Sequence, residues 1–319
     1  MIADLDVSRL SLGCAPLGNL YRGVDPADAR ATVVAALDAG VTLFDTAPLY
    51  GVGLSETRLG EVLRTVPRDR FRVATKVGRL LEPNPPGAPK EASIFEDTPA
   101  FHPVFDFSAD GVHRSLEASL TRLGLDRVDI VHVHDPDDHL DQAIDEAFPA
   151  LRRWRDEGVV GAIGAGMNFA EPLTRIVREA DIDCVLLAGQ YTMLNQNGLT
   201  ELLPLCEQTA TAVIAAAVFN TGVLADPIDG ATYAYAPASP AVLERARRMQ
   251  AVCARYDVAL NAAAIQFALG HPAVATVLVG MRSPAEVAAN NAAFDQPIPT
   301  ELWTELKAER LLPDEVPTP

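Results

Sequence analysis

The chain has 319 residues, 49% of them hydrophobic and 22% charged, with a formal net charge of −17. This acidic balance, with no basic stripe, excludes a nucleic-acid partner, because phosphates are held by clustered Lys and Arg. No apolar run reaches the roughly 18 residues that span a bilayer, and the first residues do not form a basic and then apolar leader. The sequence therefore predicts a cytoplasmic protein without a membrane partner.

Short apolar runs alternate with helical patterns along the whole chain. The expected strands are residues 10–15, 41–44, 71–75, 128–133, 160–165, 183–187, 212–217 and 275–279. The expected helices are residues 26–39, 55–64, 108–123, 140–157, 171–179, 199–208, 241–256 and 261–269. Eight strands, each followed by a helix, predict an α/β fold, a (β/α)₈ TIM barrel that forms a single domain over residues 1–319.

Three features stand out from this alternation. Residues 80–107 and 225–240 are long insertions rich in Pro or Gly, and loops of that length usually cover a functional site. The glycines of residues 161–166 lack the GxGxxG spacing before a helix, so they predict a tight strand in the barrel and not a dinucleotide-binding loop. The four cysteines are far apart and are expected to be buried, reduced thiols. They are Cys14, Cys184, Cys206 and Cys253.

Four polar residues follow the ends of neighbouring strands. Asp45 and Tyr50 come after the second expected strand, Lys76 after the third and His134 after the fourth. The carboxyl ends of parallel strands meet at one end of a barrel. A lysine beside a phenol stabilises the phenolate and lowers its pKa from about 10, and an aspartate keeps the lysine charged. Each residue alone is typical of a turn, a surface or a core, but the four together predict an acid–base site.

The segments that carry these residues resemble the aldo-keto reductase superfamily. Residues 44–51 (Phe-Asp-Thr-Ala-Pro-Leu-Tyr-Gly), followed by Ser55-Glu56, resemble its signature. Residues 74–77 resemble the strand of the superfamily that carries its lysine, here Lys76. Residues 127–134 resemble the strand that carries its histidine, here His134. The resemblance covers nearly the whole chain and implies a barrel that binds a nicotinamide cofactor without a Rossmann domain. It also implies that the tyrosine is the general acid/base, that the lysine and aspartate tune it, and that the histidine orients the substrate oxygen.

The resemblance further implies where the cofactor lies. The nicotinamide carboxamide is expected at two amides, the pyrophosphate at the loop after the seventh strand, and the adenosine after the eighth. These contacts are Asn168 and Gln190, then Asn220, Thr221 and Gly222, then Gly280, Arg282, Ser283, Glu286 and Asn290. A glutamate near the ribose repels a 2′-phosphate and accepts a hydrogen bond from a free hydroxyl, which favours NAD over NADP. Ala216 stands where many relatives carry an aromatic residue that stacks on the nicotinamide.

Residues 17–21, 133–138 and 219–222 look most like the aldose 1-dehydrogenase branch of the superfamily. That branch includes L-fucose, D-threo-aldose and L-galactose dehydrogenases, with pyridoxal 4-dehydrogenase nearby. The resemblance implies that the substrate is a sugar in its cyclic hemiacetal form, oxidised to a lactone by hydride transfer to the nicotinamide. The acidic residues Asp135, Asp137 and Asp138 can accept bonds from sugar hydroxyls, although a turn and helix-capping role is the more common one for such residues.

Other functions stay open at this point. An NADPH-dependent carbonyl reductase would share the four polar residues, but the segment 280–286 lacks the cationic pair expected for NADPH. A pyridoxal 4-dehydrogenase is a close variant of the same chemistry. A metal-dependent barrel hydrolase would use His132 and His134, but needs further ligands at strand ends, and the sequence shows none, so no metal is expected. A non-catalytic barrel would not need all four polar residues.

Overall fold

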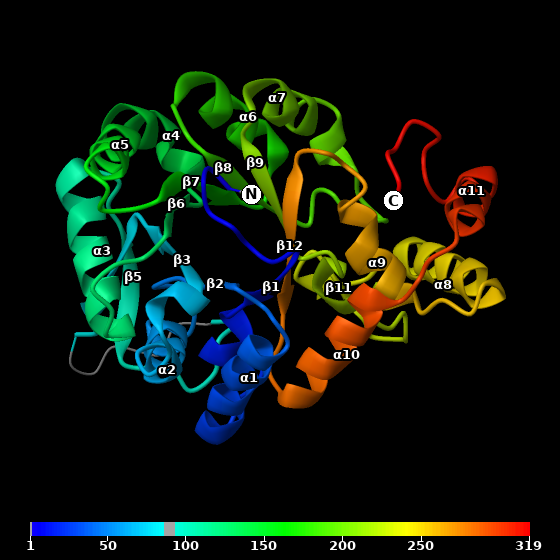
Figure 1. Ribbon diagram of the computed structural model, residues 1–319, viewed down its shortest axis with the longest axis horizontal. Coiled ribbons are helices and arrows are strands. Elements are labelled where there is room, and N and C mark those ends of the chain that lie inside the picture. Colours follow the sequence, from blue (N-terminus) through cyan, green and yellow to red (C-terminus); the bar gives the residue numbers. More distant parts are fainter. Residues whose placement is uncertain (1, 86–92) are drawn as a thin grey trace.

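Figure 1 shows the computed structural model, in which residues 2–85 and 93–319 are described. Eight parallel strands close into a barrel in the order β1-β12-β9-β8-β7-β6-β3-β2. They are β1 (Leu10–Gly13), β2 (Leu43–Asp45), β3 (Arg72–Val77), β6 (Ile130–His134), β7 (Ala162–Met167), β8 (Cys184–Ala188), β9 (Ala212–Ala216) and β12 (Val274–Gly280). The predicted barrel is confirmed, and each of the eight expected strands overlaps an observed one.

Helices surround the barrel (Figure 1). They are α1 (Pro26–Asp38), α2 (Leu54–Leu63), α3 (Ala109–Leu123), α4 (Leu140–Gln142), α5 (Phe148–Asp156), α6 (Ala170–Glu179), α7 (Leu202–Thr209), α8 (Pro240–Arg255), α9 (Leu260–Ala268), α10 (Pro284–Asp295) and α11 (Thr300–Ala308). The prediction of one helix over residues 140–157 is wrong in detail, because a π-helical turn, Ala143–Ala147, separates α4 from α5. Helix α11 was not expected at all.

The interior of the barrel has an apolar floor. Small and branched residues from successive strands, such as Ala74, Ile130 and Cys184, pack there against the amino-terminal segment. Ile2 is fully buried against them and closes that end of the barrel. Polar side chains inside the barrel therefore lie above a dry, close-packed layer, where their charges are weakly screened.

The glycines of β7 make room inside the barrel. A Cβ on Gly166 would lie 3.5 Å from Cε of Lys76, and a Cβ on Gly164 would collide with the backbone oxygen of Cys184. The run at residues 161–166 therefore serves close packing between neighbouring strands. The prediction of a tight barrel strand is confirmed.

Both insertions contain a hairpin, which the sequence did not indicate. In the first, β4 (Arg79–Pro83) pairs with β5 (Phe101–Phe105), while residues 86–92 of this expected loop lie outside the described residues. The chain before β5 then crosses to the loop after β1, where Phe95 forms a bridge with Leu20. In the second, β10 (Thr232–Tyr233) pairs with β11 (Ala236–Pro237).

The remaining predictions concern thiols and membranes. All four cysteines are buried and none is in a disulfide, as expected. None of the helices in the described ranges is long and apolar enough to cross a membrane.

Candidate active site

The barrel brings the four predicted polar residues together. Lys76 donates to Oδ2 of Asp45 at 2.7 Å and to the backbone oxygen of Thr46 at 2.9 Å. Its Nζ lies 4.5 Å from the centroid of the Tyr50 ring. The ring of His134 meets the ring of Tyr50 edge-on, with centroids 5.9 Å apart. The expected convergence at the carboxyl ends of the strands is therefore present.

The loop that carries Tyr50 is fixed by close backbone contact. A Cβ on Gly18 would lie 2.6 Å from the carbonyl carbon of Tyr50, and Gly51 has a φ of 64° while it packs against Gly18. Ser55 then donates to the backbone oxygen of Cys14 at 2.7 Å. Only glycine fits at this approach, because any side chain would push the two loops apart. The signature residues around Tyr50 thus hold the phenol in place.

Ser55-Glu56 of the signature also supports the lysine strand. Glu56 is fully buried and accepts 2.7 Å and 2.6 Å bonds from Thr75 and from Arg122 respectively. Thr75 precedes Lys76 in β3, so the bond to Glu56 ties helix α2 to β3 one residue before Lys76. A buried carboxylate with both oxygens hydrogen-bonded holds its partners in fixed positions, here Thr75 and Arg122.

The buried ion pair controls the charges of the site. Burial lowers the pKa of Lys76, but the Asp45 carboxylate and the Tyr50 oxygen outweigh burial and raise it above its usual range. Burial raises the pKa of Tyr50, and Lys76 opposes that rise without cancelling it. The predicted direction of the lysine effect is therefore present, while the predicted net decrease in the tyrosine pKa is wrong. Desolvation of the phenol is the larger effect here.

Both histidines of β6 are neutral. Burial, with help from the cations Arg79 and Lys76, holds the pKa of His134 well below its ordinary value. Burial lowers the pKa of His132 to about 3, and Lys76 adds to that decrease. Nε2 of His132 lies 3.5 Å from Sγ of Cys184, and its Nδ1 faces Oδ1 of Asp45 at 4.0 Å. His132 is therefore a core histidine that packs against the ion pair and has the Cys184 thiol as its partner.

A cavity of about 270 Å³ opens directly above these residues. Its lining includes Tyr50, Lys76 and His134, together with Asp135 and Asn168. Its other side comes from residues of the insertions, of the loops after β1 and β2, and of strand ends: Leu20, Leu49, Ile94, Phe95, Met167, Leu186, Ala188 and Tyr235. A mixed lining with one polar end suits a small molecule that presents a reacting oxygen to Asp45, Tyr50, Lys76 and His134, the four residues called the tetrad below.

A second hollow of about 290 Å³ adjoins the first and shares Tyr50 and Tyr235 with it. It runs between the ends of β1, β9 and β12, and its lining includes Thr221, Gly222, Gly280 and Arg282. Ala216 and Ala217 keep its floor open. The donors present, a guanidinium, a hydroxyl and glycine backbone, are the groups that hold phosphates. These residues are therefore the ones in this hollow that would hold the phosphates of a nicotinamide dinucleotide.

Other predicted cofactor residues do not line either hollow. The side chain of Gln190 accepts from Asn195 and Asn197, and that of Asn220 is bonded to Thr192 and to the backbone of Gly189. The remaining three shape the start of α10 beside Arg282. Ser283 caps the helix, Glu286 accepts from the backbone of Arg282 at 2.9 Å, and Asn290 donates to the backbone of Glu286.

Tyr235 is the functional candidate that sequence reasoning missed. It lies in the turn between β10 and β11, lines both hollows, and its hydroxyl lies 3.4 Å from Oδ1 of Asn168. The contact spans the mouth of the barrel from the second insertion to the end of β7. No signal in the sequence marks this residue, because only the hairpin turns it toward the site.

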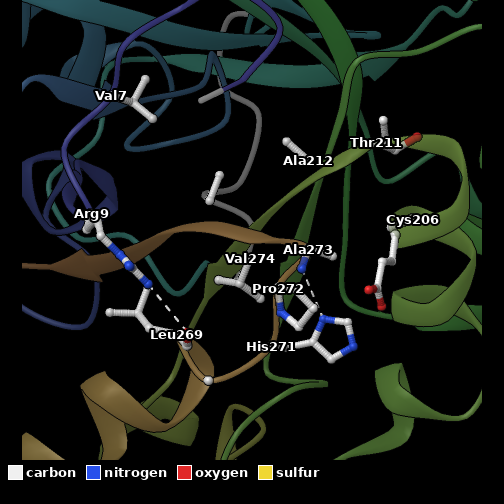
Figure 2. Close-up of a pocket in the computed structure, with 14 residues that line it drawn as sticks. Val7, Arg9, Cys206, Thr211, Ala212, Leu269, His271, Pro272, Ala273 and Val274 are labelled. Carbon is white, nitrogen blue, oxygen red and sulfur yellow. Dashed lines mark hydrogen bonds between the residues drawn. The ribbon is translucent and has the colours of Figure 1, made fainter. Parts of the chain in front are cut away.

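A larger hollow lies at the opposite end of the barrel. Figure 2 shows this basal hollow of about 560 Å³, formed at the amino ends of β9 and β12. His271 accepts there from the backbone of Ala273, and Arg9 donates to the backbone of Leu269. These two side chains therefore bond to the backbone of the loops around them.

Within the described part of the chain, no three His, Cys, Asp or Glu side chains are arranged to hold a metal ion. His132 and His134 face groups of the barrel instead. The geometry thus gives no support to a metal-dependent hydrolase.

Comparison with known proteins agrees with this geometry. Residues 9–309 match the Aldo/keto reductase family. The chain is 45% identical to a D-threo-aldose 1-dehydrogenase of a Pseudomonas species over 98% of this chain and 96% of that protein. It is 40% identical to a pyridoxal 4-dehydrogenase of Microbacterium luteolum over 97% and 95% of the two chains.

A plant protein and a solved structure extend the comparison. The chain is 34% identical to an L-galactose dehydrogenase of Arabidopsis thaliana, over 92% of this chain and 86% of that one. A holo-form aldo-keto reductase of Bacillus halodurans superposes with a TM-score of 0.76 at 25% identity, over 98% and 95% of the two chains. The chain therefore belongs to the aldo/keto reductase family, whose oxidoreductases use nicotinamide cofactors.

Proposed function

We propose that this protein is an NAD-dependent aldose 1-dehydrogenase, which oxidises a sugar in its cyclic hemiacetal form to the lactone. The observation that carries the proposal is the buried Lys76–Asp45 pair against Tyr50, at the base of a cavity with one polar end. The 45% identity to a D-threo-aldose 1-dehydrogenase over nearly the full length supports the substrate class. A nicotinamide cofactor, when bound, supplies the hydride acceptor for oxidation and the hydride donor for reduction.

The residues divide the remaining work. Tyr50, as phenolate, takes the proton from the anomeric hydroxyl while the anomeric hydrogen leaves as hydride and a carbonyl forms. Lys76 stabilises the phenolate, and Asp45 keeps the ammonium in place at 2.7 Å. His134, which is neutral, can donate a hydrogen bond to the reacting oxygen without adding a charge. The apolar floor excludes water beneath these groups.

Carbonyl reduction is the second candidate, and one observation favours it. Because burial raises the pKa of Tyr50, the phenol is mostly protonated at neutral pH and is ready to act as an acid. An acid at this position delivers a proton to a carbonyl oxygen in the reverse reaction. Oxidation through the phenolate is therefore expected to need higher pH than reduction.

The proposed preference for NAD rests on the carboxylate of Glu286, which lies beside Arg282, a residue in the lining of the second hollow. Glu286 lies 3.6 Å from Nε of Arg282 and 3.8 Å from Arg22. It offsets part of the positive charge that a 2′-phosphate would need and can accept a bond from a free ribose hydroxyl. Glu286→Gln is expected to lower kcat/KM for NAD⁺ and to raise it for NADP⁺.

The test is a substrate and cofactor screen with the purified protein. L-fucose, D-arabinose and pyridoxal are each incubated with NAD⁺ or NADP⁺ while reduced nicotinamide absorbance is followed. We expect turnover of an aldose with NAD⁺, its loss in Tyr50→Phe, and retained nucleotide binding in that variant. A flat trace over a broad sugar panel would reject the proposal, and turnover of pyridoxal alone would replace it with the vitamin substrate.

A further inference from the structure

Three acidic residues follow His134, and the structure separates one of them from the other two. Asp135 lines the catalytic cavity, whereas Asp137 and Asp138 are exposed in the 3₁₀ turn Asp137–His139. Asp135 has a φ of 42°, a left-handed conformation that is unfavourable for a residue with a Cβ. Its backbone N–H donates to the backbone oxygen of Gly166 at 3.0 Å and so fixes this turn. Strained residues of this kind concentrate at functional sites.

The first insertion supplies the partner of Asp135. Oδ2 of Asp135 accepts a 2.7 Å hydrogen bond from Arg79, the first residue of β4. The guanidinium of Arg79 lies 4.9 Å from the centroid of Phe105, which is its antiparallel partner on β5. The β4–β5 hairpin therefore fixes the side chain of Arg79 through its contact with Phe105. The pair neutralises the charge at the cavity wall while it keeps the carboxylate in a fixed orientation.

The other carboxylate oxygen has room for a ligand. Oδ1 of Asp135 accepts a long bond of 3.4 Å from Asn168, and Oδ2 lies 3.6 Å from Nε2 of His134. An ionised carboxylate offers about four lone-pair directions. Asp135 therefore retains acceptor capacity on the side of the cavity, close to the histidine that faces the reacting oxygen.

We propose that Asp135 is a specificity-determining residue that accepts a hydrogen bond from a second, non-reacting hydroxyl of a polyhydroxylated substrate, and that Arg79 positions it. The proposal rests on the proposed sugar substrate. Because the pair is neutral overall, it selects neutral polyhydroxylated molecules and not sugar acids. The insertion hairpin thereby acts in substrate choice, although it lies outside the catalytic tetrad.

The experiment compares Asp135→Ala with Asp137→Ala as the matched control. Each variant and the unaltered protein are assayed with D-arabinose and L-fucose and with the 2-deoxy and 3-deoxy forms of each, using NAD⁺. A second arm uses NADH to reduce glyceraldehyde and propanal, which differ in their hydroxyls. We expect the unaltered protein to lose about 10-fold or more in kcat/KM when the recognised hydroxyl is missing. In Asp135→Ala that penalty should disappear, and kcat/KM should fall more for glyceraldehyde than for propanal.

Each outcome has a clear meaning. A deoxy penalty that persists in Asp135→Ala, or that is reduced equally in Asp137→Ala, overturns the role of Asp135. Equal losses toward glyceraldehyde and propanal indicate a general defect and also overturn it. Arg79→Gln should raise KM for the hydroxylated substrates more than it lowers kcat, with partial rescue in Arg79→Lys. If the unaltered protein oxidises none of the aldoses, the dehydrogenase proposal is rejected. The reduction of glyceraldehyde and propanal would then still test whether Asp135 recognises a substrate hydroxyl.

Discussion

The two ends of the barrel carry hollows that differ in size and in chemistry. The basal hollow has about 560 Å³ and the catalytic cavity about 270 Å³. At the basal end, Arg9 and His271 bond to nearby backbone. At the carboxyl end, a fully buried ion pair, a phenol and a neutral imidazole face one another. Volume therefore does not locate the active site, whereas buried charges held against a proton donor do.

The largest expected contrast concerns proton transfer. Tyr50→Phe removes the acid/base oxygen but leaves the ring in its packing, so kcat should fall by about 10³-fold or more. His271→Gln in the basal hollow should leave kcat and KM within about 2-fold. Steady-state assays of both variants check this. A strong loss in His271→Gln would break the distinction between the two ends.

The next contrast compares a cation at each end. Lys76→Met leaves Asp45 buried without its partner, which should destabilise the fold by about 3–5 kcal/mol and lower turnover by about 10²-fold. Arg9→Met removes a cation that donates to Leu269 at 3.4 Å, and surface changes of that kind stay within about 0.5 kcal/mol. Urea unfolding and kinetics of both variants are the measurements. Equal destabilisation would contradict the assignment.

The pH dependence of the two directions sharpens the comparison further. Because the pKa of Tyr50 is raised, the phenolate fraction grows with pH throughout the neutral and mildly alkaline range. Oxidation should therefore rise by up to about 10-fold per pH unit, while reduction should stay flat or fall. His271→Gln should leave both profiles unchanged. An oxidation rate that is independent of pH between neutral and alkaline conditions would show that Tyr50 is not the limiting base.

The last expected effect is on stability in acid. In the folded protein the pKa of His132 is about 3, below its ordinary value of about 6.5. Between these two pH values the unfolded chain therefore binds a proton at this histidine and the folded protein does not. Its contribution to stability is complete above pH 6.5 and is lost as pH falls toward 3, with a slope of up to about 1.4 kcal/mol per pH unit.

Substitution of one histidine at each end of the barrel tests this pH dependence of stability. His132→Asn should flatten the acid limb of stability against pH, measured by denaturant unfolding. His271, whose pKa is also lowered by burial, should give a weaker flattening in His271→Asn. Identical slopes in the two variants would mean that the histidine beneath the ion pair has no special environment.

The sequence alone determined the barrel and its tetrad. Apolar runs at regular spacing fix which segments are strands, and polar residues at their carboxyl ends must converge because parallel strands share one end. Asp45, Lys76 and His134 were predicted for that reason, and Tyr50 from the loop that follows. The caps of α1 and α3, Asp25 and Ser108, are local side-chain contacts of residue types that favour this position.

Only the tertiary structure decided the rest. The net direction of the Tyr50 pKa depends on how deeply the phenol is buried, which no local pattern encodes. The selection of Asp135 over Asp137 depends on one left-handed backbone angle and on an arginine from a hairpin hidden in a Pro-rich insertion. Tyr235 reaches the cavity only because its hairpin folds across the barrel mouth. These are long-range contacts, and they exist only once distant segments pack together.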